Sequence, residues 1–343
     1  MDGHNSIPSV EKVVWDTTYA CPLRCQHCYT EAGRRHARSP KVDVIRGITE
    51  KIIATGASTV ALSGGEPIMF GGWRDIAQAF YRAGIDVTVF TSGYVMSDSD
   101  LEALRSWVGT VSVSLDGSTA ATHDELRGRI GAWDRGRGTL TRLSARKLDC
   151  RVLGETAYRL SVDYTVVRSN FRELPAFVKE ISYGTPGLDR IRVGMAIPSG
   201  LGAEPDFVER ELLRDDEANE LMDSGELLAG LIRPGCELEL TEVRPWVPTP
   251  LRTLRQQTAH VEPDGGLRAI GILEGKVGNI LEEPFEILWR RVQEMRARPE
   301  FRRLGVVRDM DEWAALMREL DEMFGSEADR ARIAKRRSLA SSL

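Results

Sequence analysis

Three cysteines crowd into eight residues near the start of the chain: Cys21, Cys25 and Cys28. They follow a β-branched run, so we expect them on a loop at the carboxyl end of a strand. Soft thiolates favour zinc or an iron–sulfur cluster. A closed zinc site takes four ligands, usually as two pairs, but Cys150 and Cys236 stand alone, and His27 has little room to turn inward. Three thiolates suit a [4Fe-4S] cluster that leaves one iron open.

The spacing CxxxCxxC followed by an aromatic residue, Tyr29, resembles the signature of the radical S-adenosylmethionine (radical SAM) superfamily. A second stretch resembles that family's GGEP element and comprises Gly64, Gly65, Glu66 and Pro67. The resemblance implies one [4Fe-4S] cluster whose open iron chelates the amino and carboxylate groups of SAM. It also implies that the GGEP element receives the methionine amino group, and that a 5′-deoxyadenosyl radical abstracts hydrogen from a substrate. Glycines suit close backbone approach, and Glu66 is an acceptor for an ammonium group.

Further positions resemble the family's ribose- and carboxylate-contacting residues, and they are Ser92, Ser114 and Asp116. Residues 123–128 read HDELRG and match the HDxxRG stretch of the subgroup that matures peptides and related metabolites. By this resemblance Arg127 pairs with the SAM carboxylate, although a bare arginine is more often a surface residue. Met195 is a candidate contact for adenine, with a place in the core as the alternative.

Two later segments, HVEPDGGLRAI (260–270) and GNILEEPFEILWRRV (278–292), resemble pieces of the SPASM domain. That domain occurs in pyrroloquinoline-quinone and mycofactocin maturases, sulfatase-maturing enzymes and aminoglycoside-modifying relatives, where cysteines hold auxiliary clusters. Here everything after Cys236 is free of cysteine, and Ile270 stands near one expected cysteine position. The resemblance therefore covers about Val13 to Val292 and implies a degenerate SPASM-like module without an auxiliary cluster.

Auxiliary clusters commonly accept an electron in net oxidations, so their absence favours redox-neutral chemistry such as epimerisation. An epimerisation needs a thiol that returns hydrogen, and Cys236 is a better candidate than Cys150; for each the alternative is a small buried hydrophobe. The preferred substrate is a sugar-containing or other small polar metabolite. Alternatives are epimerisation or crosslinking of a ribosomally made peptide, dehydrogenation of a sugar hydroxyl, and a non-catalytic iron–sulfur or zinc scaffold. The implied redox partner is an external one-electron donor resembling flavodoxin or ferredoxin.

Short β-branched runs alternate with amphipathic stretches, as in parallel strands joined by crossover helices. Six segments are expected as strands: VVWDTT (13–18), STVALS (58–63), IDVTVF (85–90), TVSVSL (110–115), LSVDYTVV (160–167) and IRVGMAI (191–197). Expected helix starts are Ser39-Pro40 and either Ser97 or Ser99. Six units favour an α/β fold with a partial (β/α)6 TIM-type barrel. Both motifs then fall at the carboxyl ends of strands, where such barrels carry their active sites.

The chain divides by composition. We expect an N-terminal extension (1–12), the barrel (13–200), a helical and proline-rich connection (201–250), and a smaller α+β SPASM-like or twitch-like module with C-terminal helices (251–343). A hairpin turn is expected at Asp264-Gly265. Only about a dozen residues precede the first strand, which is too few for a winged leader-binding domain, so a peptide enzyme would need a separate partner.

Charge and hydropathy exclude several classes of protein. The net charge of −5 argues against nucleic acid as the main partner. Two basic clusters, 127–137 and 330–337, are expected to be a solvated loop and a frayed helix end. No apolar run approaches the ~20 residues that span a bilayer, and the first ten residues lack the features of a secretory signal. Five cysteines, an odd number, suit a reduced compartment. We therefore expect a cytoplasmic enzyme of natural product biosynthesis.

Overall fold

A single curved sheet organises the molecule. The computed structural model describes residues 9–35, 40–241, 257–307 and 309–340. Within these residues ten strands pair in the order β10-β9-β8-β1-β2-β3-β4-β5-β6-β7. Their bounds are β1 (Lys12–Thr18), β2 (Thr59–Gly64), β3 (Asp86–Thr91), β4 (Thr110–Ser114), β5 (Arg159–Val166), β6 (Arg190–Met195), β7 (Glu237–Thr241), β8 (Thr258–Val261), β9 (Gly266–Arg268) and β10 (Lys276–Asn279). Strands β1 to β7 and β8 run parallel, and the expected α/β partial barrel is confirmed.

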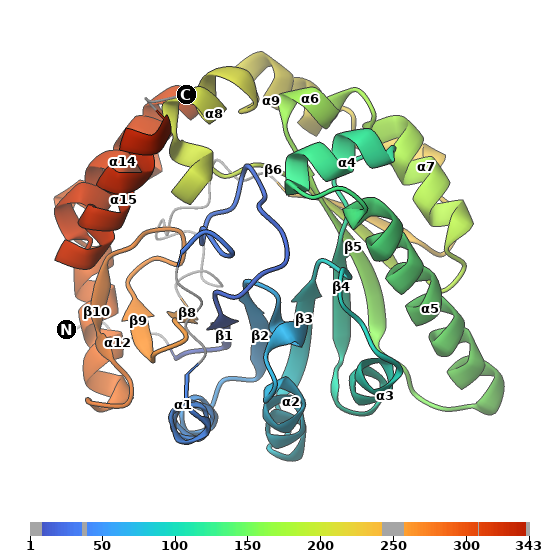
Figure 1. Cartoon of the computed structure of the whole chain (residues 1–343), viewed down its shortest axis with the longest axis horizontal. Helices are drawn as coiled ribbons and strands as arrows, with labels where there is room; N and C mark the ends of the chain where they lie inside the picture. Colours follow the sequence, from blue (N-terminus) through green and yellow to red (C-terminus); the bar gives the residue numbers. More distant parts are fainter. Residues whose placement is uncertain (1–8, 36–39, 242–256, 308, 341–343) are drawn as a thin grey trace, which may run out of the picture.

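Helices cover the outer face of this sheet. Figure 1 shows α1, α2, α3, α5 and α7 outside the curve of the strands. The helical segments between β1 and β6 are α1 (Val42–Ala54), η1 (Pro67–Met69), α2 (Trp73–Arg82), α3 (Asp98–Trp107), α4 (Ala120–Arg127), α5 (Ala132–Leu153), α6 (Arg168–Phe171) and α7 (Leu174–Gly184). Ring contacts tie the layers together: Trp15 of β1 meets Phe80 of α2, and Tyr164 of β5 meets Phe177 of α7.

The expected helix starts can be compared with the structure. Ser97 caps α3, because its hydroxyl accepts a hydrogen bond from the Asp100 backbone N–H while the Asp100 carboxylate accepts one from the Ser97 N–H. The other expected start includes Ser39, which lies outside the described residues, and α1 begins at Val42. The apolar stripe of α1 faces the core, as periodicity predicts, because Ile45, Ile48 and Ile52 are buried.

The region after β6 contains a strand that the sequence did not lead us to expect. Strand β7 pairs with β6 in parallel and extends the barrel within the proline-rich connection. The segments before it are η2 (Gly200–Ala203), α8 (Pro205–Arg210), α9 (Asp215–Asp223) and α10 (Gly225–Leu231). Its two outward leucines are only half-buried, which explains why ELELT carries a weak strand signal. Pro245, Pro248 and Pro250 lie outside the described residues.

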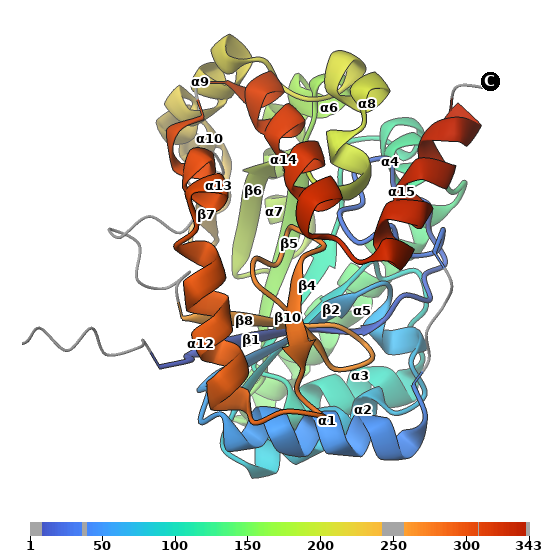
Figure 2. The same ribbon diagram turned by 90° about the vertical axis from the view of Figure 1, so that its left-hand side faces the viewer.

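The C-terminal part joins the other edge of the same sheet. Strand β8 pairs in parallel with β1, and β9 turns back on β8 in antiparallel register, with His260 opposite Arg268. Gly265 in the turn has φ +89°, a left-handed conformation that glycine adopts without strain. The helical segments that follow are α12 (Phe285–Arg296), α13 (Pro299–Arg302), η3 (Arg303–Val306), α14 (Met310–Phe324) and α15 (Glu327–Ala340). Figure 2 shows α12, α14 and α15 on the side of the molecule that carries these strands.

Candidate active site

The cysteine loop leaves β1 at its carboxyl end and is anchored by backbone hydrogen bonds to the end of α4. The N–H of Arg24 donates to the carbonyl of Arg127, and the N–H of Gln26 donates to the carbonyl of Leu126, both over 2.9 Å. Gly128 ends α4 with φ +64°, and a Cβ there would lie 2.4 Å from the Arg24 carbonyl oxygen. Only glycine allows this approach, so the sequence of α4 fixes where the loop sits.

The HDELRG stretch forms α4 and the turn after it, and three of its side chains face inward or hold the next helix. His123 Nδ1 accepts a hydrogen bond from the Asp116 backbone N–H over 3.0 Å. The Asp124 carboxylate accepts hydrogen bonds from the N–H groups of Gly131 and Trp133, at the start of α5. His123 and Arg127 are four residues apart on one face of the helix. The motif therefore holds the loop after β4 and the cysteine loop together.

Arg127 joins the cysteines to the end of β4. Its Nε lies 2.6 Å from Asp116 Oδ2, and its guanidinium donates to Cys25 Sγ over 3.8 Å. Although burial opposes the charged forms, the ion pair raises the pKa of Arg127 and lowers the pKa of Asp116. The view of Arg127 as a solvated surface residue is therefore wrong, because its side chain is 11% exposed. In this structure it contacts a thiol and a carboxylate.

His27 turns toward Asp116. Its Nε2 lies 3.4 Å from Asp116 Oδ2. Burial lowers the pKa of His27 to about 4 even though Asp116 opposes the shift, so the imidazole is neutral near pH 7. Its Nδ1 is buried and makes no hydrogen bond to any described residue. Sequence reasoning missed His27 as a partner of Asp116, because spacing alone does not show which way a side chain between two cysteines turns.

The GGEP element packs directly on the start of the cysteine loop. The N–H of Gly65 donates to the Thr18 carbonyl over 2.7 Å, and the N–H of Glu66 donates to the Ala20 carbonyl over 2.9 Å. A Cβ at Gly64 or Gly65 would come within 2.6 or 2.2 Å of these backbone oxygens. Both glycines are thus required for the end of β2 to lie against this loop.

Glu66 is fully buried and accepts hydrogen bonds from the end of β3. Its carboxylate receives the Thr91 hydroxyl over 2.8 Å, and the Ser92 hydroxyl and backbone N–H over 2.5 and 2.8 Å. Ile68 N–H donates to the same group over 3.4 Å, and Pro67 begins the short η1 turn there. Burial raises the pKa of Glu66, while these donors oppose the shift. Two of the expected SAM-contacting residues, Glu66 and Ser92, therefore touch each other.

Whether the three cysteines fit a cluster depends on their donor chemistry. Burial raises the pKa of Cys21 to about 12 and that of Cys25 to about 11; Arg127 opposes the second shift, and the neighbouring thiols add to both. Among the described residues no three His, Cys, Asp or Glu side chains converge tightly enough to hold one metal ion. Three neighbouring thiols fit a [4Fe-4S] cluster, which takes one thiolate on each of three irons.

A second buried pair lies beside this site. His260 Nε2 of β8 lies 3.0 Å from Asp16 Oδ2 of β1, and both residues are almost fully buried. The ring of Tyr29 meets the His260 ring edge to face, and its hydroxyl lies 3.4 Å from Ser63 Oγ. Sequence reasoning placed Tyr29 here but missed Asp16 and His260. Asp16 could have been noticed in the sequence, because it is an acidic residue near the end of a hydrophobic strand and a buried charge needs a partner.

The last helix also reaches the cysteine loop. Arg336 of α15 lies 2.6 Å from Glu31 Oε1, and Arg332 lies 3.3 Å from the same oxygen. Glu31 has φ +54° and follows Cys28 by three residues. Arg332 also pairs with Glu274 and Asp329. The expectation that this basic cluster is a frayed helix end is therefore wrong for Arg332 and Arg336, which are paired and mostly buried.

Four further expected residues can be placed relative to this site. Cys236 comes directly before β7, and Cys150 lies near the end of α5, which leads to the start of β5. Both positions are at the amino ends of the parallel strands, opposite to the cysteine loop, so the structure does not bring Cys236 to the site as a hydrogen donor. Met195 shares a face of β6 with the buried Ile191 and Val193 and packs in the apolar core. Ser114 ends β4 beside Asp163 of β5.

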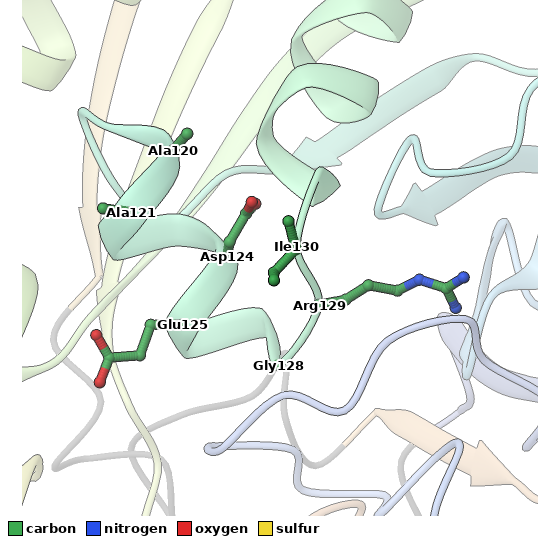
Figure 3. A pocket seen from close by; sticks show the side chains of 7 residues that line it. All are labelled: Ala120, Ala121, Asp124, Glu125, Gly128, Arg129 and Ile130. Carbon is green, nitrogen blue, oxygen red and sulfur yellow. The ribbon is translucent and has the colours of Figure 1, made fainter.

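A shallow hollow lies where α4 turns into α5. Its lining residues are Ala120, Ala121, Asp124, Glu125, Gly128, Arg129 and Ile130 (Figure 3). Arg129 extends away from the hollow and donates to the Pro22 carbonyl in the cysteine loop over 2.7 Å. The hollow is therefore formed by α4 and the turn before α5, which support the cysteine loop.

These features together define a protein class. Three thiols, the GGEP turn and the Asp116–Arg127 pair meet at the carboxyl ends of parallel strands. Residues 15–155 match the family model described as "Radical SAM superfamily". Residues 15–155 therefore carry a radical SAM domain, the domain of a superfamily that uses a [4Fe-4S] cluster and SAM.

Two curated proteins and one solved structure are similar to this chain. An AdoMet-dependent heme synthase of Methanosarcina barkeri is 29% identical over 57% of this chain and 53% of its own length. The sporulation killing factor maturation protein SkfB of Bacillus subtilis is 29% identical over 54% of this chain and 43% of its own length. The chain thus spans about half the length of these curated relatives. The structure of Streptococcus suis SuiB bound to S-adenosylmethionine matches 89% of this chain and 70% of that chain, with a TM-score of 0.65 at 15% identity. That likeness shows the fold.

Proposed function

We propose that this protein cleaves SAM at a cluster held by Cys21, Cys25 and Cys28, and that it abstracts a hydrogen atom from a substrate at the inner face of the barrel. The observation that carries the proposal is the contact of Arg127 with both Cys25 Sγ and Asp116. A buried guanidinium beside a thiol suits a site that holds deprotonated sulfur and the negative charge of a cluster.

When bound, the cluster would supply one electron, and SAM would supply a sulfonium whose cleavage gives the 5′-deoxyadenosyl radical. The residues of the chain prepare the place where this happens. Arg127 offsets thiolate charge, and Asp116 keeps Arg127 in position. Glu66 fixes Thr91 and Ser92 at the end of β3, where Ser92 is expected to meet the ribose. Tyr29 and the two glycines of GGEP close the loop against β2. The role of Arg127 toward the SAM carboxylate stays a prediction.

A peptide is the substrate class that we favour. It is supported by SkfB, which is named as a maturation protein and matches 54% of this chain. A sugar-containing or other small polar metabolite is the second candidate, and the match to a relative named as a heme synthase supports a substrate that is not a peptide. The distance of Cys150 and Cys236 from the site removes the thiol on which epimerisation depended, so we propose hydrogen abstraction without assigning either cysteine as donor.

We also propose an external one-electron donor of the flavodoxin or ferredoxin type, since a single cluster needs an electron for each cleavage. Among the described residues, each helix is too short or too polar to span a bilayer. The five free thiols support our proposal of a reducing compartment such as the cytoplasm.

The test uses the full chain, reconstituted anaerobically with iron and sulfide and reduced with dithionite. Iron content, electron paramagnetic resonance with and without SAM, and 5′-deoxyadenosine formation are measured. Cys25→Ala should abolish the cluster signal and SAM cleavage, because the remaining thiols hold the irons poorly. Cys150→Ala is the matched control, because it removes a buried cysteine at the other end of the barrel.

Each outcome decides something. About four irons per chain, a signal that SAM perturbs, and loss of cleavage in the Cys25 variant alone support the proposal. Retained cleavage in Cys25→Ala overturns the site assignment. About eight irons would mean a second cluster in the C-terminal part, and net oxidation or peptide crosslinking would then become the leading reaction.

A further inference from the structure

The inner face of the barrel is polar over β4 to β7. Side chains alternate along each strand, and the set facing away from the helices is Ser112, Ser114, Ser161, Asp163, Thr165, Arg190, Arg192, Glu237, Glu239 and Thr241. The opposite set is apolar and packs on the helices. Closed barrels of this type fill their interior with bulky branched apolar residues. A charged inner face instead indicates a surface that meets a polar ligand.

Four of these charged side chains and Lys12 of β1 form one group, which we name the inner-face charge cluster: Lys12, Asp163, Arg190, Arg192 and Glu239. Arg192 lies between two carboxylates, 3.4 Å from Asp163 Oδ1 and 3.5 Å from Glu239 Oε1. Arg190 lies 2.7 Å from Glu239 Oε2, and Ser112 donates a hydrogen bond to Asp163 Oδ2. The register explains the grouping, because Asp163, Arg192 and Glu239 are direct neighbours across β5, β6 and β7.

Arg192 is held in place with its hydrogen-bonding capacity unfilled. Both ion-pair distances exceed those of charge-assisted hydrogen bonds, and Nε is buried without a hydrogen-bond partner among the described residues. The side chain is still 33% exposed, and its guanidinium lies 5.9 Å from the centre of the Phe90 ring. Arginine presents a planar fork of donors that matches a carboxylate or phosphate. The neighbouring acids therefore orient this fork without occupying it.

The charges of the cluster do not cancel. Three cations face two carboxylates, which leaves one positive charge in excess. Lys12 of β1 makes no ion pair with the described part of the chain, and burial together with Arg192 lowers its pKa. A mostly buried cation beside other cations is costly unless an anion joins it. One monoanionic group would neutralise the cluster.

Arg192 of the cluster lies on the inner face of the barrel, a short way along β6 from the level of the Asp116–Arg127 pair. Arg192 precedes Gly194 by two residues, and Gly194 pairs with Thr165. The N–H of Thr165 donates to Asp116 Oδ1 over 2.9 Å. Two residues of strand rise about 7 Å. An anion held by Arg192 would thus leave the next few atoms of its molecule level with the Asp116–Arg127 pair.

From these contacts we infer that the inner-face charge cluster binds a carboxylate group of the substrate, with Arg192 as the residue that grips it and Lys12 as the balancing cation. The inference rests on the proposed function, because it names a substrate feature for the same site. A carboxylate is favoured over a phosphate because its single charge matches the excess of one. Asp163 and Glu239 are positioning residues that hold Arg192.

The experiment titrates the reconstituted full chain, with SAM present, with acetate, inorganic phosphate and the neutral isostere acetamide, and follows each probe by ligand-observed NMR. Acetate should bind saturably and acetamide should not. Arg192→Gln should weaken acetate binding by about tenfold or more, and Arg192→Lys by less, because it retains the charge and loses the fork. Lys12→Gln should weaken binding as well, and it tests the cluster even if the Arg192 variant fails to fold. Arg172→Gln, which alters an exposed arginine paired with Glu220, is the matched control and should bind as wild type.

Equal acetate binding in Arg192→Gln and wild type would overturn the inference, as would the absence of saturable binding. If phosphate binds more tightly than acetate, and the Arg192 and Lys12 variants lose phosphate binding, the ligand group is a phosphate. That result would overturn the assignment of a carboxylate. SAM cleavage by wild type is measured in the same preparation. Cleavage without anion binding sinks this inference alone, whereas anion binding without cleavage sinks the proposed function alone.

Discussion

Arg127 Nε lies 2.6 Å from Asp116 Oδ2, and this ion pair is buried between the cysteine loop and the end of β4. Asp116 also receives the Thr165 N–H, so its position is shared by two strands and α4. Removing one partner of a buried pair leaves an uncompensated charge, which costs about 3–5 kcal/mol in typical cases. Arg127→Gln should therefore lower the melting temperature and the iron content together. Calorimetry and iron analysis of the reconstituted protein measure the two effects.

Arg135→Gln is the matched control for that variant, because Arg135 is an exposed arginine of α5 whose guanidinium lies over the Tyr94 ring. It should keep wild-type stability to within about 0.5 kcal/mol and bind the same amount of iron. The double variant Arg127→Gln with Asp116→Asn should recover part of the lost stability, since it removes both charges. No recovery would show that the two side chains act separately.

Glu66→Gln should loosen the end of β3. The carboxylate accepts hydrogen bonds from the Thr91 hydroxyl, the Ser92 hydroxyl and the Ser92 N–H. A glutamine places its NH₂ against donors on one side and leaves a buried donor unsatisfied, at a cost of about 1–3 kcal/mol. We expect a lower melting temperature and a raised KM for SAM, measured by 5′-deoxyadenosine formation. A changed KM with unchanged stability would point to direct contact with SAM instead.

The sequence was sufficient for much of the barrel and for the site motifs. The six expected strands match β1 to β6 within one or two residues, because each strand carries a short β-branched run that favours extended backbone. Both motifs and the HDELRG stretch meet at one edge, since each follows the carboxyl end of a strand or the helix after it. Parity along the strands also indicates the face of each side chain.

Other relationships depend on tertiary contacts that spacing does not reveal. The pairing of Asp16 with His260 joins residues 244 apart, and it exists only because β8 adds to β1 in parallel. The residues after Cys236 carry only a weak strand signal. The sequence therefore did not show that Cys236 lies directly before β7 and away from the site. The orientation of His27 was equally hidden, because it is set by the position of Asp116 on another strand.

Glu31→Gln should make the cluster easier to remove. Glu31 pairs with Arg332 and Arg336 of α15, and these contacts hold the residues after Cys28 in a left-handed turn. Without the charge, the turn loses its partners and opens more often, which exposes the irons. We expect a chelator to remove iron faster from the variant than from wild type. The decay of cluster absorbance measures this rate. Glu300→Gln, which alters a half-buried carboxylate paired with Arg298, is the control and should lose iron at the wild-type rate.

Asp321 of α14 should make stability depend on pH. Burial, with a further contribution from Glu274, raises the pKa of its carboxyl from an ordinary 3.8 to about 7, while the Glu274 N–H, Arg268 and Arg336 oppose the shift. The folded state thus binds a proton that the unfolded state has released, so stability falls as pH rises between the two values. Asp321→Asn keeps the oxygen that accepts the Glu274 N–H and removes the charge. The variant should match wild type near about pH 4 and melt several degrees higher at about pH 8. Melting curves of variant and wild type at both pH values measure this effect, and Glu322→Gln is an exposed control on the same helix. The same difference in melting temperature between Asp321→Asn and wild type at both pH values would contradict the assignment.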